Sequence, residues 1–328
     1  MAALATEKWQ LNLERIFREM EHQLTPLELK ALLPALEKQS GFLGKLVASS
    51  VVLSRLREED AETFFANDPC PGIRLFADPS VRKEDKALLI GFCDSSARLL
   101  IPVGQFLQHI PAKKFDVLTL ADAGSTSFEI GAGTVRGTMP SWVGQLSRKF
   151  EVQRYHTLYC VGASVGGFPA LRSTSMFRAK RSVSLAGTFA WPIKRLRAGE
   201  RVEAFDPLCA CRPQSGELVV AFSSGHVRDA AHAQQMQRRV GATLMPAEGK
   251  SHNVVQELVL AGKLDAFLGS IFEFDPKQPD DGSRLPPPPK PQRDLRYHVE
   301  RLLHRMGREP SEPKAFVRPR PKHDDSGP

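Results

Sequence analysis

The sequence predicts an α/β fold in which helices cover both faces of a mostly parallel sheet. Three mostly apolar stretches have the length of strands, namely Lys86 to Phe92, Phe115 to Leu120 and Glu217 to Phe222. Such runs are typical of strands that are buried on both faces. Helix-type segments alternate with them, and this alternation indicates right-handed crossovers between parallel strands. The chain has 328 residues, of which 41% are hydrophobic, and this is enough for one large core with appendages.

The shorter elements continue the same alternation. Further strands are expected at Ile73 to Phe76, Leu158 to Val161, Ser182 to Ala186 and Thr243 to Pro246, and helices at Val103 to His109, Thr138 to Phe150, Phe168 to Phe177, Asp229 to Val240 and Asn253 to Phe272. Together these elements define an α/β domain at residues 67–274.

Residues 1–66 are expected to form a helical extension ahead of this domain. Thr25-Pro26-Leu27-Glu28 is a capping box with proline at the first helical position, which is a strong helix start. A third helix is expected from Ser40 to Leu56 and a short fourth one from Glu58 to Phe65, before the break at Asn67 to Gly72. The extension either packs on the α/β domain or is part of a partner-binding array of helix pairs.

The C-terminal segment, residues 275–328, differs in composition. It contains about half of the 25 prolines, including Pro286 to Pro289. Because it cannot bury enough apolar surface to fold alone, we expect a mostly disordered tail. The proline run is either a stiff spacer or a ligand for a proline-binding protein partner.

Charge, apolar runs and cysteine content narrow the range of partners, locations and cofactors that we expect. The net charge of +8 comes with no nucleic-acid motif, so we expect no nucleic-acid partner. The sequence has no apolar run of 18 residues, so we expect no membrane span, and the first residues do not have the pattern of a signal peptide. Five scattered cysteines indicate a reducing, cytoplasmic location. Cys209-Ala210-Cys211 has no second ligand pair, so no metal and no cofactor are expected.

The central motif is Gly162-Ala163-Ser164-Val165-Gly166, which lies between a predicted strand and a predicted helix. G-x-S-x-G in this context indicates a nucleophile elbow. The small residues let the strand and helix backbones pass close together, and the strained serine oxygen projects above the sheet. Ser164 is therefore the candidate nucleophile, and the Val165 N–H is a candidate oxyanion donor.

A serine nucleophile needs a histidine base that is oriented by a carboxylate. His252 follows the last predicted strand in Gly249-Lys250-Ser251-His252, at the same sheet edge as Ser164. Asp229 follows the strand before it and is the candidate acid, with Asp206 as the alternative. The second oxyanion donor should come from the loop after Lys86 to Phe92, and we assign it to the N–H of Phe92 or Cys93. We interpret the Cys93 thiol as packing.

On these residues, namely G-A-S-V-G at 162–166, Asp229 and G-K-S-H at 249–252, residues 73–272 resemble the α/β-hydrolase superfamily. They are also similar to compact bacterial members found with surface-polysaccharide genes. The resemblance implies a Ser-His-Asp hydrolase of an ester, thioester or amide, or an acyltransferase, without a cofactor. It further implies an esterase that acts on a small-molecule or glycan-linked acyl ester. Gly91-Phe92-Cys93 replaces the usual His-Gly, and the first strands of the superfamily sheet are not evident.

A small cap is expected at about residues 187–216. There Trp191, Arg195 and Arg197 are candidates for contacts with an apolar acyl group on an anionic carrier, unless this segment is only a solvated basic loop. Two other functions remain open. One is a non-catalytic hydrolase-like domain that binds a glycan or protein. The other is an interaction protein that acts through the N-terminal helices or the proline-rich tail.

Overall fold

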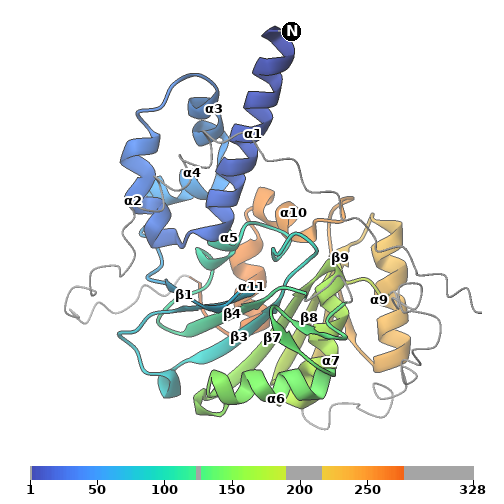
Figure 1. Ribbon diagram of the computed structural model, residues 1–328. Helices are drawn as coiled ribbons and strands as arrows, with labels where there is room; N and C mark the ends of the chain where they lie inside the picture. The colour runs from blue at the N-terminus through green and yellow to red at the C-terminus, as the bar shows by residue number, and fades with distance from the viewer. Residues whose placement is uncertain (1, 123–126, 190–215, 277–328) are drawn as a thin grey trace, which may run out of the picture.

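The computed structural model describes residues 2–122, 127–189 and 216–276, with side chains from Gln10 onward. Its centre is an eight-stranded sheet in the order β1-β2-β4-β3-β7-β8-β9-β10 (Figure 1). The strands are β1 (Phe65–Cys70), β2 (Ile73–Ala77), β3 (Ala87–Phe92), β4 (Phe115–Leu120), β7 (Thr157–Ala163), β8 (Arg181–Leu185), β9 (Glu217–Ser223) and β10 (Thr243–Ala247). All neighbours from β4 to β10 pair in parallel, whereas β2 is antiparallel to both β1 and β4. A two-residue hairpin, β5 (Gly131–Ala132) with β6 (Val135–Arg136), forms a separate small sheet.

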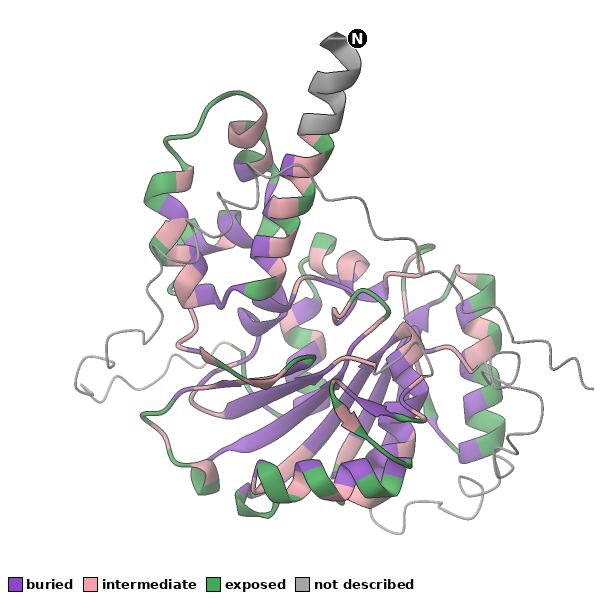
Figure 2. Ribbon diagram, viewed as in Figure 1, coloured by how far each residue is buried: buried purple, intermediate pink, exposed green. Residues whose placement is uncertain are grey.

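Helices cover both faces of the large sheet, as the sequence predicts. One face is covered by α5 (Val103–Leu107), α10 (Val254–Leu260) and α11 (Leu264–Phe272), and the other by α6 (Met139–Lys149), α7 (Gly167–Phe177) and α9 (Val227–Val240). In Figure 2 the central strands of the sheet are largely buried and the edge strands β1 and β10 are not, while α6 and α9 each have a buried and an exposed side. Within the described residues, no helix is long and apolar enough to cross a membrane.

The strand expected at Ile73 to Phe76 is present as β2, whereas β1 was not evident from the sequence. β1 and β2 form an antiparallel hairpin that extends the sheet to its full width. The segment Asn67-Asp68-Pro69-Cys70 has turn chemistry, and for this reason its sequence predicts a break. β1 lies at the edge of the sheet, where proline is tolerated because one row of N–H groups has no strand to pair with.

Four helices precede the sheet: α1 (Ala2–Gln23), α2 (Pro26–Leu36), α3 (Gly41–Ser49) and α4 (Val51–Glu58). The capping box at Thr25 is present, since the Thr25 hydroxyl accepts from the Glu28 N–H and the Glu28 carboxylate accepts from the Thr25 N–H. The expected single helix from Ser40 to Leu56 is wrong. Ser50 adopts an extended backbone and its hydroxyl caps α4 by accepting from the Leu53 N–H, so the helix restarts there. Residues 59–64 are not helical either.

The four helices share a small core of their own and rest on α5. Gly104 of α5 makes this contact possible, because a Cβ there would lie 2.5 Å from the carbonyl oxygen of Leu24. An ion pair also joins the helical extension to the sheet domain. Arg55 of α4 donates to both oxygens of Asp265 in α11 at 3.1 and 3.2 Å, and His109 lies 2.7 Å from the same carboxylate. The helical extension is thus fixed to the sheet domain by packing and by charge.

The closing helix predicted at Asn253 to Phe272 is instead two helices, α10 and α11. Gly262 interrupts it with a positive φ of 64°, a conformation that glycine adopts without strain. The interruption keeps α10 short, and its first turn directly follows the loop that carries His252.

Candidate active site

Ser164 lies at a sharp turn between β7 and α7. Its φ is +50°, in the left-handed region that non-glycine residues seldom adopt. β7 ends at Ala163, and a single 3₁₀ turn from Ser164 to Gly166 leads into α7. The turn therefore has the strained geometry that G-x-S-x-G predicts.

The two glycines of the motif are required by close backbone approaches. A Cβ at Gly162 would lie 2.0 Å from the Gly166 carbonyl oxygen, and a Cβ at Gly166 would lie 2.2 Å from the Phe92 carbonyl oxygen. Both distances are far below van der Waals contact. Any side chain at either position would move α7 away from β7 or from the end of β3, and Ser164 would move with it.

His252 comes to Ser164 from the loop between β10 and α10. Its Nε2 lies 3.0 Å from Ser164 Oγ, which is hydrogen-bond distance. Its Nδ1 lies 2.9 Å from each carboxylate oxygen of Asp229. With the ring proton on Nδ1, the Nδ1–H group donates a hydrogen bond to the carboxylate, and the Nε2 lone pair faces the serine hydroxyl.

Asp229 lies in the first turn of α9, just after β9, and its side chain is only 2% exposed. A buried carboxylate must find hydrogen-bond donors, and here it finds imidazole N–H groups. The alternative acid, Asp206, lies outside the described residues. The structure thus brings Ser164, His252 and Asp229 together from three separate parts of the sheet edge.

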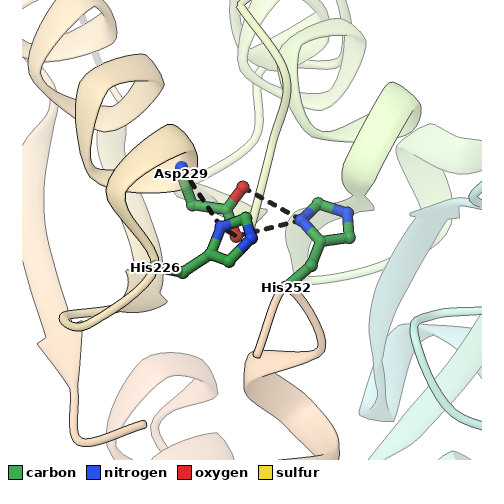
Figure 3. A group of neighbouring side chains, drawn as sticks. All are labelled: His226, Asp229 and His252. Carbon is green, nitrogen blue, oxygen red and sulfur yellow. Dashed lines mark hydrogen bonds and ion pairs between the residues drawn. The ribbon is translucent and has the colours of Figure 1, made fainter. Parts of the chain in front are cut away.

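A second histidine also contacts Asp229, and the sequence analysis did not identify it. His226 precedes α9, and its Nδ1 lies 3.0 Å from Asp229 Oδ2 (Figure 3). The rings of His226 and His252 have centroids 5.7 Å apart. The same Nδ1 lies 3.4 Å from the Asp229 backbone N–H. One nitrogen cannot both donate and accept, and the shorter contact to the charged oxygen favours donation to the carboxylate. The available signal was the three-residue spacing to Asp229 at a helix start.

The oxyanion assignments have different outcomes. The Val165 N–H lies in the first turn after the strand, where N–H groups have no acceptor within the helix. The Cys93 N–H donates to the Leu120 carbonyl at 2.9 Å, so the assignment of this group is wrong because the sheet already uses it. Phe92 is the last residue of β3 and is paired with Gly162, and its role stays a prediction.

The Cys93 thiol does not compete with Ser164 as a nucleophile. It is 2% exposed and belongs to the hydrophobic core. Burial raises the pKa of this thiol well above its usual value, so the reactive thiolate does not form near neutral pH. This placement agrees with its interpretation as a packing residue.

Two side chains of α10 and its cap hold the loop that carries His252. Glu257 Oε1 accepts from the backbone N–H groups of Lys250 at 3.0 Å and Ser251 at 2.6 Å. Asn253 caps α10 by accepting from the Gln256 N–H, and its amide donates to the Leu100 carbonyl at 2.6 Å. Neither residue belongs to a motif that the sequence analysis used.

The expected cap at 187–216 lies almost entirely outside the described residues. Trp191, Arg195, Arg197, Cys209 and Cys211 all fall there, as does the proline-rich tail from residue 277 onward. At the described edge of this segment, Phe189 packs edge-on against Phe168 of α7, with ring centroids 4.9 Å apart.

Comparisons with known proteins gave structural likeness only. No family model and no curated protein matches the sequence. Among solved structures, a carboxylesterase of the thaumarchaeon Nitrososphaera gargenis is 11% identical, with 64% of this chain and 99% of that chain covered and a TM-score of 0.42. The fluorophosphonate-binding serine hydrolase F of Staphylococcus aureus is 12% identical (61% and 96% covered, TM-score 0.40). A bottromycin epimerase is 15% identical (63% and 98% covered, TM-score 0.39).

The strand order and strand directions of the sheet indicate the fold of the chain. Its sheet has one antiparallel strand in second position followed by parallel strands, with β3 between β4 and β7. The strained serine follows β7, at the carboxyl edge where His252 and Asp229 also lie. By this strand order and this serine turn, the chain has the fold of the α/β-hydrolase superfamily.

Proposed function

We propose that the protein is a serine hydrolase that cleaves a carboxylic ester or thioester through an acyl-enzyme. One observation carries the proposal, namely the contact of 3.0 Å between Ser164 Oγ and His252 Nε2 in a ring whose other nitrogen lies 2.9 Å from buried Asp229. A serine in such an arrangement loses its proton to the base as it attacks.

In the first half-reaction, Ser164 Oγ attacks the carbonyl carbon while His252 Nε2 takes the hydroxyl proton. The buried Asp229 carboxylate stabilises the imidazolium that forms. The Val165 N–H, with a second donor for which Phe92 is the candidate, stabilises the negative oxygen of the tetrahedral intermediate. His252 then returns the proton to the leaving alkoxide or thiolate, and the acyl group stays on Ser164.

In the second half-reaction, His252 takes a proton from water, and the hydroxide attacks the acyl-enzyme. Collapse of the second intermediate releases the acid and returns the proton to Ser164. An acceptor hydroxyl in place of water gives acyl transfer with the same groups. The substrate class that we propose, acylated sugars and related acyl esters, is taken from the sequence resemblance.

The direct test is labelling of the full chain with a fluorophosphonate probe, which reacts with activated serines without the need for a known substrate. We expect labelling of the wild type and none of Ser164→Ala or His252→Ala. Asp229→Asn should label more slowly by roughly 10²- to 10⁴-fold, because the base loses its correct tautomer. Ser175→Ala is the matched control, because Ser175 is an exposed serine of α7, the helix that Ser164 precedes.

Folding of each variant is checked by circular dichroism and by the thermal midpoint. Labelling of Ser164→Ala at the wild-type rate would refute the assignment of the nucleophile. A folded wild type that does not label at all would refute the hydrolase proposal and favour a binding domain. If labelling occurs, a panel of acyl esters, acyl thioesters and acylated sugars, each with and without an acceptor alcohol, distinguishes hydrolysis from transfer.

A further inference from the structure

Two imidazole nitrogens contact the Asp229 carboxylate, whereas a Ser-His-Asp relay needs only one. His226 Nδ1 lies 3.0 Å and His252 Nδ1 lies 2.9 Å from Asp229 Oδ2. Figure 3 shows the His226 and His252 rings both beside the Asp229 carboxylate. One ligand atom from each residue can be chosen so that all three lie within 4.8 Å of one another.

Two imidazoles and one carboxylate form a donor set that suits Zn²⁺ and similar divalent transition-metal ions. Metal–ligand bonds of about 2.0–2.1 Å place neighbouring ligands of a tetrahedral ion about 3.3 Å apart. Two of the three ligand spacings are already near this value. Three protein ligands also leave one position for water, as in many zinc sites.

Burial decides which groups can adjust around an ion. The Asp229 side chain is 2% exposed, so its position is set by the core. The side chains of His226 and His252 are 29% and 41% exposed and lie on segments that flank helices. These rings can therefore tilt toward a common ion, and an ion can reach them from solvent.

We propose that His226, Asp229 and His252 bind one divalent transition-metal ion such as Zn²⁺, and that the bound ion switches off the serine. The ion bonds to Nδ1 of each ring and to a carboxylate oxygen. Each neutral ring gives up its Nδ1 proton and gains one at Nε2 through solvent, so no net proton is lost. His252 Nε2 then carries a hydrogen and cannot accept the Ser164 proton. This inhibitory half of the proposal rests on the proposed hydrolase function, whereas metal binding itself does not.

Two cysteines outside the described residues can compete for zinc, and the experiment must remove them. Cys209 and Cys211 are two thiols separated by a single residue, and thiolates bind Zn²⁺ well. The measurements therefore use the full chain with Cys209→Ser and Cys211→Ser as the background. In this background we compare His226→Ala with His156→Ala. His156 is an exposed histidine that precedes β7, at the end of that strand opposite to Ser164.

Two readouts are measured against ZnCl₂ concentration. Equilibrium dialysis gives the number of ions per chain and their affinity, and the fluorophosphonate labelling rate gives the state of Ser164. We expect one ion per chain in the background and with His156→Ala. With His226→Ala the affinity should fall by more than about tenfold, since loss of even an outer-shell partner typically costs 10–100-fold. Labelling should slow with the same half-saturation as binding and recover with EDTA.

Every outcome bears on the proposal. Equal zinc affinity with and without His226 would overturn the site. Loss of all binding in the cysteine-free background would assign zinc to the two cysteines instead. Saturable binding that leaves the labelling rate unchanged would overturn the inhibitory role. If the zinc-free protein does not label, the hydrolase proposal fails, but dialysis with His226→Ala still decides whether the metal site exists.

Discussion

The Glu257 carboxylate is expected to hold the base in position without contacting substrate. Its Oε1 accepts two backbone N–H groups of the loop that carries His252, at 2.6 and 3.0 Å. Its Oε2 fills the space beside Gly249, where a Cβ would lie 1.1 Å from that oxygen. Glu257→Ala removes both bonds and opens this space, so the loop can leave the position that places His252 Nε2 at Ser164.

The size of the effect follows from these contacts. Hydrogen bonds to a charged group contribute about 1.5–3 kcal/mol each, and the lower end applies here because water can reach the exposed Lys250 and Ser251 backbone. Loss of about 1.5–3 kcal/mol from the productive loop position corresponds to roughly 10–100-fold. A misplacement of about 1 Å can cost a similar factor of about 10². We therefore expect Ser164 labelling to slow by roughly 10–100-fold in Glu257→Ala.

The assay is the second-order rate constant for fluorophosphonate labelling, measured beside the thermal midpoint. Glu248→Ala is the matched control, because Glu248 precedes the same loop but its side chain is 93% exposed. Glu257→Gln keeps one acceptor oxygen and the side-chain volume, so its rate should lie between those of wild type and Glu257→Ala. A Glu257→Ala protein that labels as fast as Glu248→Ala would refute the reasoning, because the loop would then hold its position unaided.

Three further predictions concern stability. Gly166→Ala should lower the free energy of unfolding by roughly 1–3 kcal/mol through overpacking. Gly144→Ala should not, because the nearest atom is 3.7 Å from the added Cβ. Equal urea midpoints for the two variants would contradict this prediction. Burial tends to raise the pKa of Asp265, but hydrogen bonds from His109 and Arg55 lower it to about 2. This stabilisation is therefore present above the unfolded pKa near 3.8 and lost as pH falls from about 4 to 2. This stabilisation is about 1 kcal/mol, a reduced value because the carboxylate is 37% exposed and solvent screens it. In Asp265→Asn, the free energy of unfolding measured with urea should depend less on pH between about 4 and 2. Lys86→Met should cost about 3–5 kcal/mol in urea unfolding, because the buried Asp116 loses its ion pair and keeps the hydrogen bond from Tyr155. Lys86→Met with Asp116→Leu should recover part of this loss, since Tyr155 and the Asp78 carbonyl then lose their partners; no recovery would contradict the pairing.

The order of the site residues along the chain could be read from the sequence because of sheet geometry. Ser164, Asp229 and His252 each follow a strand of a parallel sheet, and the carboxyl ends of parallel strands meet at one edge. Apolar runs show where those strands are, so the edge and the order follow. The strained turn was predictable for a different reason, namely that Gly162 and Gly166 have the spacing that a close strand–turn–helix crossing requires.

Other features depended on contacts that no local pattern records. β1 contains Asn67, Asp68 and Pro69, and only its place at the sheet edge makes this composition compatible with a strand. Whether the Cys93 N–H is free depends on the register of β3 with β4, and a sequence gives no register. Glu257 accepts hydrogen bonds from backbone N–H groups six and seven residues earlier in the chain, a contact that no local sequence pattern indicates.

His226 links the proposed reaction to the proposed metal site, because both depend on the same carboxylate. In the serine relay, the Asp229 carboxylate accepts hydrogen bonds from the Nδ1–H groups of His252 and His226, and both rings keep their Nε2 atoms free of hydrogen. In the metal site, the ion takes the place of these two protons, and His252 Nε2 must carry one. The two states differ in the tautomers of both rings and cannot coexist on one molecule. Zinc and the activated serine therefore compete through His252 itself, so an ion bound at these atoms must slow labelling in proportion to its occupancy.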